Sequence, residues 1–169
     1  MGVIKKRLLF LPLLLSLLLV PTSASADFAT GLAAYERGDY KTAFEEFKRL
    51  AQQGYAGAQT NLGFMYDHGL GVPQDYAKAL KWYRKAAQQG NAEAQNSLGR
   101  MYGISLGVAL NYVLALLWCN LAASRSAGES REQSSKARDR VAKNMTPSQI
   151  AEAQKLAREW KPKEEVKEK

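Results

Sequence analysis

Apolar and polar positions in the central part of the chain follow the helical period, in two segments separated by a glycine-rich bend. Apolar side chains recur three and four residues apart, which predicts one helix near residues 56–67 and a second near 74–89. The segment 68–73 ends the first helix, because glycine adopts positive φ and proline cannot continue a helix. On the second helix the residues expected to face water are Lys78, Lys81, Arg84 and Lys85.

This pattern of helix, bend and helix returns after 36 residues. Residues 55–90 and 91–126 carry the same amino acid at 16 of 36 positions. A fixed internal period of this length is typical of repeat proteins, in which each unit buries its apolar face against its neighbours. A partial copy with a shortened bend precedes them near 31–54. The chain is therefore predicted to be an all-α solenoid, with hairpins near residues 28–53, 55–89 and 91–125.

The central copy resembles a known repeat family. Between Ala56 and Gly90 it reads A-x-A-Q-x-x-L-G-x-M-Y-x-x-G-x-G-V-x-x-D-Y-x-K-A-x-x-W-x-x-K-A-A-x-x-G. This run is similar to the Sel-one-like repeat, and the resemblance implies an array of α-helical hairpins related to tetratricopeptide repeats. We expect the loop of the next copy to bend differently, because it departs from the pattern at Ser105, Asn111 and Ser126, which replace Gly69, Asp75 and Gly90.

The second helix of the last copy has an apolar stripe that the central copy lacks. Four leucines, Leu110, Leu114, Leu117 and Leu121, stand where the central copy has Gln74, Lys78, Lys81 and Lys85. An uncovered stripe of this kind would form a large hydrophobic patch. We expect the C-terminal part of the chain, residues 127–160, to cap it. The alternative is that the four leucines form a dimer or partner interface.

The C-terminal segment has the signals of two helices, near 129–144 and 147–160. Thr146, Pro147 and Gln149 form an N-cap, a proline at the first helical position and a capping-box glutamine. Trp160 is expected to pack on the stripe, at a cost of about 3–5 kcal/mol for its truncation if it is fully buried. Residues 161–169 are highly charged and are predicted to form a disordered tail.

The first 26 residues have the pattern of a secretory signal peptide. Basic residues 5–7 precede an apolar run from Leu8 to Val20, and Ala24-Ser25-Ala26 supplies a cleavage motif. A membrane anchor is the alternative, but the run is interrupted by Pro12 and is shorter than the roughly 20 residues that a spanning helix needs. We expect cleavage after Ala26, a mature protein in the periplasm or outside the cell, and no stable membrane insertion thereafter.

The net charge and the small number of histidines and cysteines argue against several classes of function. The net charge of +8 falls to +5 (8 − 3) without the three basic residues of the signal peptide, an excess too dispersed to predict nucleic-acid binding. With one histidine and one cysteine, the chain offers no intramolecular disulfide and no zinc-ligand pattern. We predict no cofactor and no metal site. A basic surface on the helix near 129–144, facing an anionic partner, is a weaker third hypothesis.

The sequence contains no recognised catalytic motif. There is no nucleophile elbow, and no lysine has a serine three residues before it, as a serine β-lactamase would require. The resemblance nevertheless keeps a hydrolase as the alternative, because some cysteine-rich members of the family are associated with β-lactam hydrolysis. Their paired cysteines are missing here, and Cys119 is expected to be a buried apolar side chain. A cell-wall-acting enzyme belongs to the same alternative.

The favoured function is that of a non-catalytic binding module for an envelope protein or peptide, monomeric unless the leucine stripe pairs two copies. The resemblance implies that ligand contacts come from first-helix positions near the Leu-Gly pair, on the concave face. These positions are Thr60, Phe64, Asp67 and His68 in the central copy, and Asn96 and Arg100 in the next. Phe64 is expected either to anchor a partner or to pack against the neighbouring hairpin. If these positions are free of packing, Phe64→Ala and Arg100→Ala should change stability by less than about 1 kcal/mol.

Overall fold

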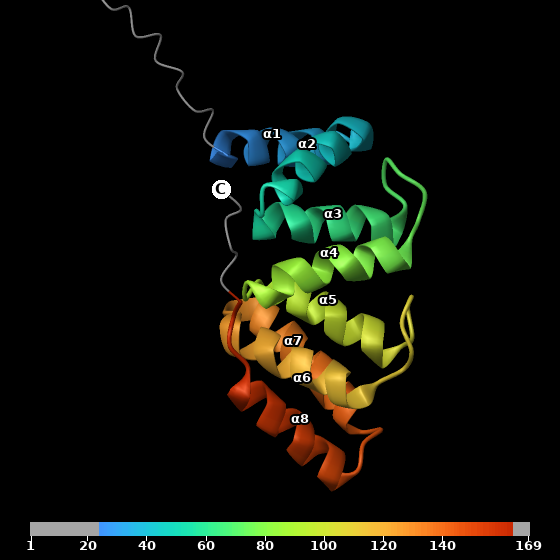
Figure 1. The fold of residues 1–169 in the computed structure, drawn as a ribbon, viewed down its shortest axis with the longest axis vertical. Coiled ribbons are helices and arrows are strands. Elements are labelled where there is room, and N and C mark those ends of the chain that lie inside the picture. The colour runs from blue at the N-terminus through green and yellow to red at the C-terminus, as the bar shows by residue number, and fades with distance from the viewer. Residues whose placement is uncertain (1–23, 164–169) are drawn as a thin grey trace, which may run out of the picture.

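The computed structural model describes residues 24–163, and all the regular structure within that range is α-helical (Figure 1). The predicted fold class, an all-α solenoid of stacked hairpins, is confirmed. The helices of the described range are α1 Ala24–Glu36, α2 Tyr40–Gln52, α3 Ala56–His68, α4 Tyr76–Gln88, α5 Ala92–Gly103, α6 Tyr112–Arg125, α7 Gly128–Ala142 and α8 Pro147–Glu159.

Consecutive helices form three hairpins, α1 with α2, α3 with α4 and α5 with α6, and each second helix also packs on the first helix of the next hairpin. The first hairpin begins at Ala24 rather than near residue 28. Most of the predicted signal peptide, residues 1–23, lies outside the described range, and its last three residues form the start of α1. The first side-chain ion pair of α1 is made by Asp27, whose carboxylate lies 3.1 Å from the guanidinium of Arg49 on α2.

The second helix of each hairpin begins at the same kind of cap. Asp39, Asp75 and Asn111 each accept a hydrogen bond from the backbone N–H three residues ahead, at 3.2, 2.9 and 2.9 Å. The amide oxygen of Asn111 accepts this bond as a carboxylate does, so the change from aspartate keeps the cap. The backbone hydrogen bond from Asn111 N–H to the Tyr102 carbonyl matches the one from Asp75 to Tyr66.

The bends of the two long loops are alike, contrary to the expectation from sequence. Ser105 has a φ of 60°, close to the 68° of Gly69 in the preceding repeat. Its hydroxyl donates to the carbonyl of Val108 at 3.0 Å, which holds the loop in place. The glycine two residues later, Gly107, has a φ of 64°, and a Cβ there would lie 2.6 Å from the Cβ of Tyr76. The close approach between hairpins therefore preserves the bend even where glycine has been replaced.

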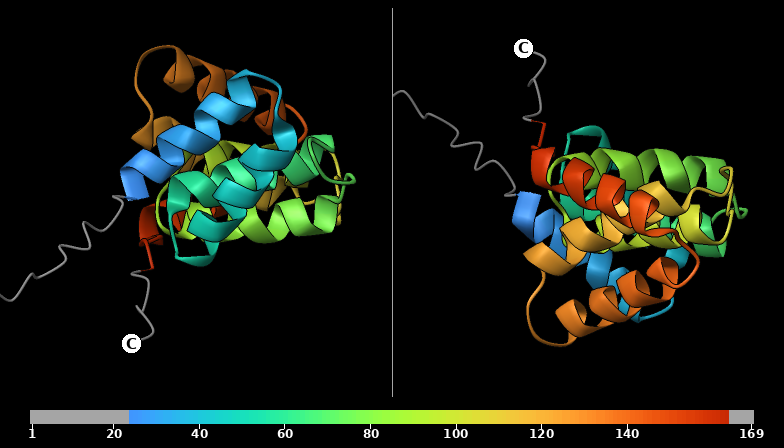
Figure 2. Two further views of the ribbon diagram at one scale, coloured as in Figure 1. Left: turned by 90° about the horizontal axis from the view of Figure 1, so that it is seen from above. Right: turned by 90° about the horizontal axis from the view of Figure 1, so that it is seen from below.

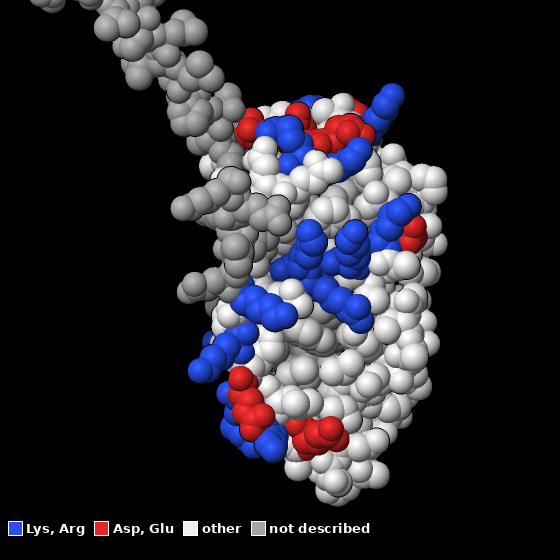
Figure 3. All heavy atoms as spheres, in the orientation of Figure 1, with Lys and Arg blue, Asp and Glu red and all other residues white. Residues whose placement is uncertain are grey.

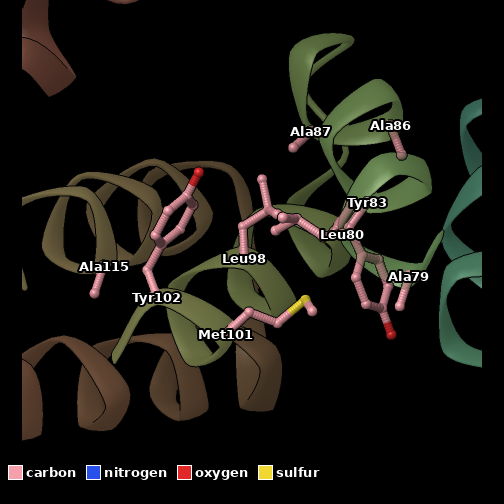
Figure 4. Close-up of a cluster of buried hydrophobic side chains, with 10 residues drawn as sticks. Ala79, Leu80, Tyr83, Ala86, Ala87, Leu98, Met101, Tyr102 and Ala115 are labelled. Carbon is pink, nitrogen blue, oxygen red and sulfur yellow. The ribbon is translucent and has the colours of Figure 1, made fainter. Parts of the chain in front are cut away.

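Two contiguous groups of buried apolar side chains form the core, one centred on Phe47 and Leu62 and the other between α4, α5 and α6. In the second group Leu98 of α5 points toward Leu80 of α4 (Figure 4). The two hairpin helices approach closely at glycine, since a Cβ on Gly63 would lie 2.8 Å from the Tyr83 ring. Close packing of this kind explains why the Leu-Gly pair recurs in both copies.

The C-terminal helices α7 and α8 both pack on α6 rather than on one another, and they lie on different sides of it (Figure 2). The predicted capping box at Thr146 is present, with Gln149 as its partner. Leu117 and Leu121 are buried, at 7% and 3% exposure, while Leu114 is half-buried. The prediction that the C-terminal segment covers the leucine stripe is wrong for Leu110. This residue precedes the first residue of α6 and is 51% exposed.

The chain after α8 turns back along the stack. Trp160 is half-buried rather than fully buried, because it ends α8 at the surface, with its ring against Trp118 at 6.4 Å. The guanidinium of Arg125 lies 4.5 Å from the centre of the Trp160 ring. The backbone N–H of Lys163 donates to the carbonyl of Gln88 at 2.9 Å, so the prediction of disorder is wrong for residues 161–163. Residues 164–169 lie outside the described range.

Basic side chains gather on the side of the stack that faces the viewer in Figures 1 and 3, over α4. As predicted, four exposed side chains of this helix face water, Lys78, Lys81, Arg84 and Lys85. The cationic groups of three of them lie over aromatic rings, as the Lys85 ammonium does 5.0 Å from the centre of the Trp82 ring. No helix within residues 24–163 is long and apolar enough to cross a membrane.

Candidate binding face of the first helices

The first helix α1 and the C-terminal helix α7 lie on one side of the stack, and the second helix α4 and the C-terminal helix α8 lie on the other (Figure 2). All the binding residues predicted from sequence lie on the first helices α3 and α5. Thr60 and Asp67 are buried, at 6% and 3% exposure, so the expectation that packing leaves them free is wrong for these two. The Thr60 hydroxyl donates to the carbonyl of Ala56 at 2.9 Å, which satisfies it within its own helix.

The carboxylate of Asp67 joins three helices. It accepts a hydrogen bond from the Tyr83 hydroxyl on α4 at 3.3 Å and forms an ion pair with the guanidinium of Arg100 on α5. Burial, together with the negative charge of Asp67, raises the pKa of Tyr83, so this hydroxyl stays protonated and donates. The Arg100 side chain is still 42% exposed. Arg100 is therefore both a structural partner and a surface cation.

Phe64 and His68 form a small aromatic group on α3. Their rings stack at 4.0 Å with an interplanar angle of 25°, and the His68 Nδ1 lies 3.0 Å from the Phe64 carbonyl oxygen. Phe64 is half-buried and meets the Tyr35 ring of α1 edge to face, at 6.3 Å. The alternative in which Phe64 packs against the neighbouring hairpin is thus present in the structure. His68 is exposed and covers part of the Phe64 ring.

A groove of about 730 Å³ lies between α5 and α7, with α6 beneath it. This volume is within the roughly 300–1,000 Å³ of known ligand sites. Cys119 of α6 lies at its floor and Ile104, 61% exposed, at the end of α5. The residues that line it include Asn96, Arg100 and Gly103 from α5 and Lys136, Arg140 and Val141 from α7.

The repeats differ at one first-helix position beside the groove. Between α3 and α5 the space is occupied by the ion pair of Asp67 and Arg100. One period later Gly103 stands at the place of Asp67, with no side chain to fill the interval between α5 and α7. The counterparts of Thr60, Phe64, Asp67 and His68 are Asn96, Arg100, Gly103 and Ile104, and all four line the groove.

Among the groove residues, only Asn96 and Arg100 are predicted from sequence as binding positions. The same 36-residue register could have found Gly103 and Ile104, since they are the counterparts of two residues already chosen. The α7 residues had no such signal, because α7 was interpreted as a cap for the leucine stripe. In the structure α7 packs on α5 as well as on α6, and so forms the second wall of the groove.

The electrostatics of the groove are cationic. Arg100, Lys136 and Arg140 line it, and no Asp or Glu is among its lining residues. Burial raises the pKa of the Cys119 thiol to about 11, although the positive charges of Arg140 and Arg138 act in the opposite direction. A thiol with this pKa is protonated near neutral pH and is a poor nucleophile. Residues 24–163 contain no cluster of three or more His, Cys, Asp or Glu side chains that could hold a metal ion.

Comparison with known proteins points to one family. The family model described as Sel1 repeat matches residues 56–91 and 92–126. The crystal structure of a Sel1 repeat protein from Oxalobacter formigenes is 33% identical, with a TM-score of 0.58, and the match covers 68% of this chain and 89% of that one. A protective antigen of uropathogenic Escherichia coli strains, described as displaying an SLR fold, is 32% identical with a TM-score of 0.75. That match covers 81% of this chain and 29% of the antigen.

Two curated relatives share a shorter segment. They are named DAP3-binding cell death enhancer 1, from Rattus norvegicus and Mus musculus, and each is 42% identical over 45 residues. This segment is 27% of the present chain and only 9% of either relative, so the chain spans less than a tenth of their length. The repeat register, the hairpin geometry and the match over most of a solved relative agree, and the chain belongs to the Sel1 repeat family.

Proposed function

We propose that this protein is an exported, non-catalytic interaction module of the cell envelope that binds a protein or peptide through its first-helix face. Proteins of the Sel1 repeat family generally serve as scaffolds for protein–protein interaction. One observation carries the proposal for this chain. The first-helix positions that differ between the two full repeats converge on one side, and in the last interval they line a groove of about 730 Å³.

The proposal of export rests on the sequence of the first 26 residues. A mature chain that begins at Asp27 would shorten α1 by its first three residues, and it would keep the ion pair with Arg49 and the ring contact between Phe28 and Phe47. N-terminal sequencing of the protein from its native host tests this, and an intact Met1 in that protein would contradict export with cleavage.

The alternative, an envelope hydrolase, lacks an observation in its favour. The one thiol among the groove residues, that of Cys119, is protonated near neutral pH because burial raises its pKa to about 11. The Lys136 ammonium at the same groove is paired with Glu132. The histidine on the first-helix face, His68, stacks on Phe64 and is not among the groove residues. Recognition therefore accounts for these residues better than catalysis does.

The binding face is tested by capture of partners from an envelope extract with crosslinking. A first-helix variant, Phe64→Ala with His68→Ala, should lower the yield of crosslinked partner, because it removes the stacked rings. The matched variant on the opposite side is Lys81→Ala with Lys85→Ala, which should leave the yield unchanged. Loss with the α4 variant and not with the α3 variant would place the binding surface on the second helices instead.

A further inference from the structure

The groove between α5 and α7 has a chemistry that selects a particular class of partner. Its cations, Lys136 and Arg140, lie four residues apart on α7, so they share one face of that helix. Arg100 faces them from α5. Two of the three cations already have partners, since Arg100 pairs with Asp67 and the Lys136 ammonium lies 2.6 Å from Glu132. Within residues 24–163, Arg140 has no ion-pair partner.

An unsatisfied polar group lies at the same groove. The side-chain oxygen of Asn96 is buried and has no hydrogen-bond donor within the described residues. A buried acceptor without a donor costs free energy, which a ligand N–H can relieve. The side-chain amide torsion of asparagine is broad, so a rotation can turn this oxygen toward the groove. A peptide backbone is the most common source of such an N–H.

The remaining wall is apolar. Ile104 is 61% exposed, and Val141 and Ala137 line the groove from α7. A ligand that pairs with Arg140 and donates to Asn96 would therefore also meet aliphatic surface. Extended peptides that combine carboxylates with aliphatic side chains match this combination of groups, whereas a uniformly charged polyanion would leave Ile104 uncovered.

We infer that the groove between α5 and α7 binds an extended acidic peptide segment of a partner protein, with carboxylates on Arg140 and Lys136, a backbone N–H on Asn96 and an aliphatic side chain against Ile104. This inference rests on the proposed function and specifies its ligand. Charge complementarity carries it, because no acidic residue lines the groove and Arg140 has no ion-pair partner within residues 24–163. Arginine pairs with carboxylates through two parallel N–H donors, which gives geometric selectivity as well as attraction.

The surroundings of Gly103 predict the effect of a substitution at this position. A Cβ on Gly103 would lie 3.6 Å from the Ala115 Cβ and 3.6 Å from the nearest Val141 methyl, which are ordinary contacts. Gly103→Asp would thus fit and would place a carboxylate where the preceding repeat has Asp67. That carboxylate would compete with the carboxylates of the peptide. Gly103→Ala adds the same Cβ without the charge and is the matched control.

The test measures the affinity of a labelled peptide that alternates glutamate and valine, by fluorescence anisotropy. The control is a peptide of the same length that alternates glutamine and valine. We expect the acidic peptide to bind residues 27–169 at least about tenfold more tightly, and to weaken with added salt because charge pairs are screened. Arg140→Gln and Gly103→Asp should each weaken it about fivefold or more. Lys143→Gln should leave its affinity within about twofold, and Gly103→Ala should weaken it less than Gly103→Asp does.

The control Lys143→Gln removes one positive charge from the same helix at an exposed position outside the groove. An equal loss of affinity in Lys143→Gln and Arg140→Gln would indicate general electrostatic attraction and would overturn the inference. Equal binding of the acidic and glutamine peptides would overturn it as well. If partner capture by the α3 face persists in that case, the proposed function stands and only the groove assignment fails. Far-ultraviolet circular dichroism of each variant verifies that it is folded.

Discussion

Arg100 on α5 pairs with the buried carboxylate of Asp67 on α3, and this ion pair links two successive first helices that have few other contacts. From sequence, both residues are predicted to lie on a surface that packing leaves free. Asp67 is instead only 3% exposed, and its second partner is the hydroxyl of Tyr83. A residue that differs between repeats can therefore still be a packing residue, because its contacts can be specific to one pair of successive first helices.

Removal of Arg100 should destabilise the protein. Arg100→Ala leaves the Asp67 carboxylate buried with a single donor, so we expect the free energy of unfolding to fall by about 1–3 kcal/mol. This replaces the expectation of less than about 1 kcal/mol from sequence. Urea denaturation of Arg100→Ala, Asp67→Asn and the double variant measures the coupling. Strict additivity of the two single changes would contradict the link.

An exposed pair of similar composition is the control for that experiment. The Lys78 ammonium lies 2.9 Å from the Asp75 carboxylate, with 58% and 30% of the two side chains exposed. Lys78→Ala should cost no more than about 0.5 kcal/mol, since solvent screens such pairs. A loss as large as that of Arg100→Ala would show that burial of Asp67 is not the reason for the difference.

Ser105 is predicted to strain its loop. Its φ of 60° is a conformation that glycine adopts readily and serine does not. Ser105→Gly should raise the free energy of unfolding by about 0.5–1 kcal/mol, reduced by the loss of the hydroxyl bond to Val108. The reverse change in the preceding repeat, Gly69→Ser, should be destabilising by a similar amount. A destabilised Ser105→Gly protein would show that the hydroxyl outweighs the backbone strain.

Trp160 should contribute less than a fully buried tryptophan. It is half-buried at the end of α8, where its ring contacts Trp118 and the guanidinium of Arg125. We expect Trp160→Ala to cost about 1.5–3 kcal/mol, below the range for a fully buried ring. Trp160→Phe keeps a ring against Trp118 and should recover part of that loss. Thermal denaturation gives both values, and a loss above about 4 kcal/mol would contradict partial burial.

Deletion of the cap should cause self-association. Without residues 129–169, α6 loses α7 and α8 and exposes Leu117 and Leu121, which are buried in the intact chain. Size-exclusion chromatography with light scattering should detect dimers or aggregates. A chain that ends at Lys163 keeps both helices and the bond to Gln88, and it should behave as the full chain does. A monomeric truncated protein would show that the two leucines need no cover.

The Cys119 thiol should react slowly in the folded protein. Its pKa is raised to about 11, so the neutral thiol is favoured and the thiolate fraction at pH 8 is about a thousandth. Alkylation at pH 8 should therefore be at least about a hundredfold slower than for an unfolded cysteine, whose pKa is about 8.5. The rate should rise about tenfold per pH unit up to about pH 11. Fast labelling at pH 8 would contradict the burial of this thiol.

The fold followed from sequence because its determinants are local and repeated. The 36-residue period, the Leu-Gly pairs and the caps at Asp75 and Thr146 each act within one or two helices. The helical hairpins and the stack could therefore be predicted from the pattern alone. Bend geometry was less predictable, because the positive φ of Ser105 accompanies a hydroxyl bond to Val108 and a close approach of Gly107 to the neighbouring hairpin.

The candidate site followed from sequence only in part. The register of the repeats identified the first-helix positions, which is why Asn96 and Arg100 could be named. It could not distinguish a buried Asp67 from an exposed His68, since both differ from their counterparts one period later. The burial of a first-helix side chain depends on the helix that lies next to it. For Asp67 this helix is α5, which supplies Arg100.

The all-α class, the repeat register and the positions at which the repeats diverge follow from the amino-acid pattern alone. That α7 packs beside α5, with Gly103 at the groove between them, is a feature of the folded chain. The helix α7 lacks the 36-residue repeat pattern, so its place depends on how its side chains pack on α6. The groove is a property of two helices and the missing side chain between them, and periodicity carries no information about that space.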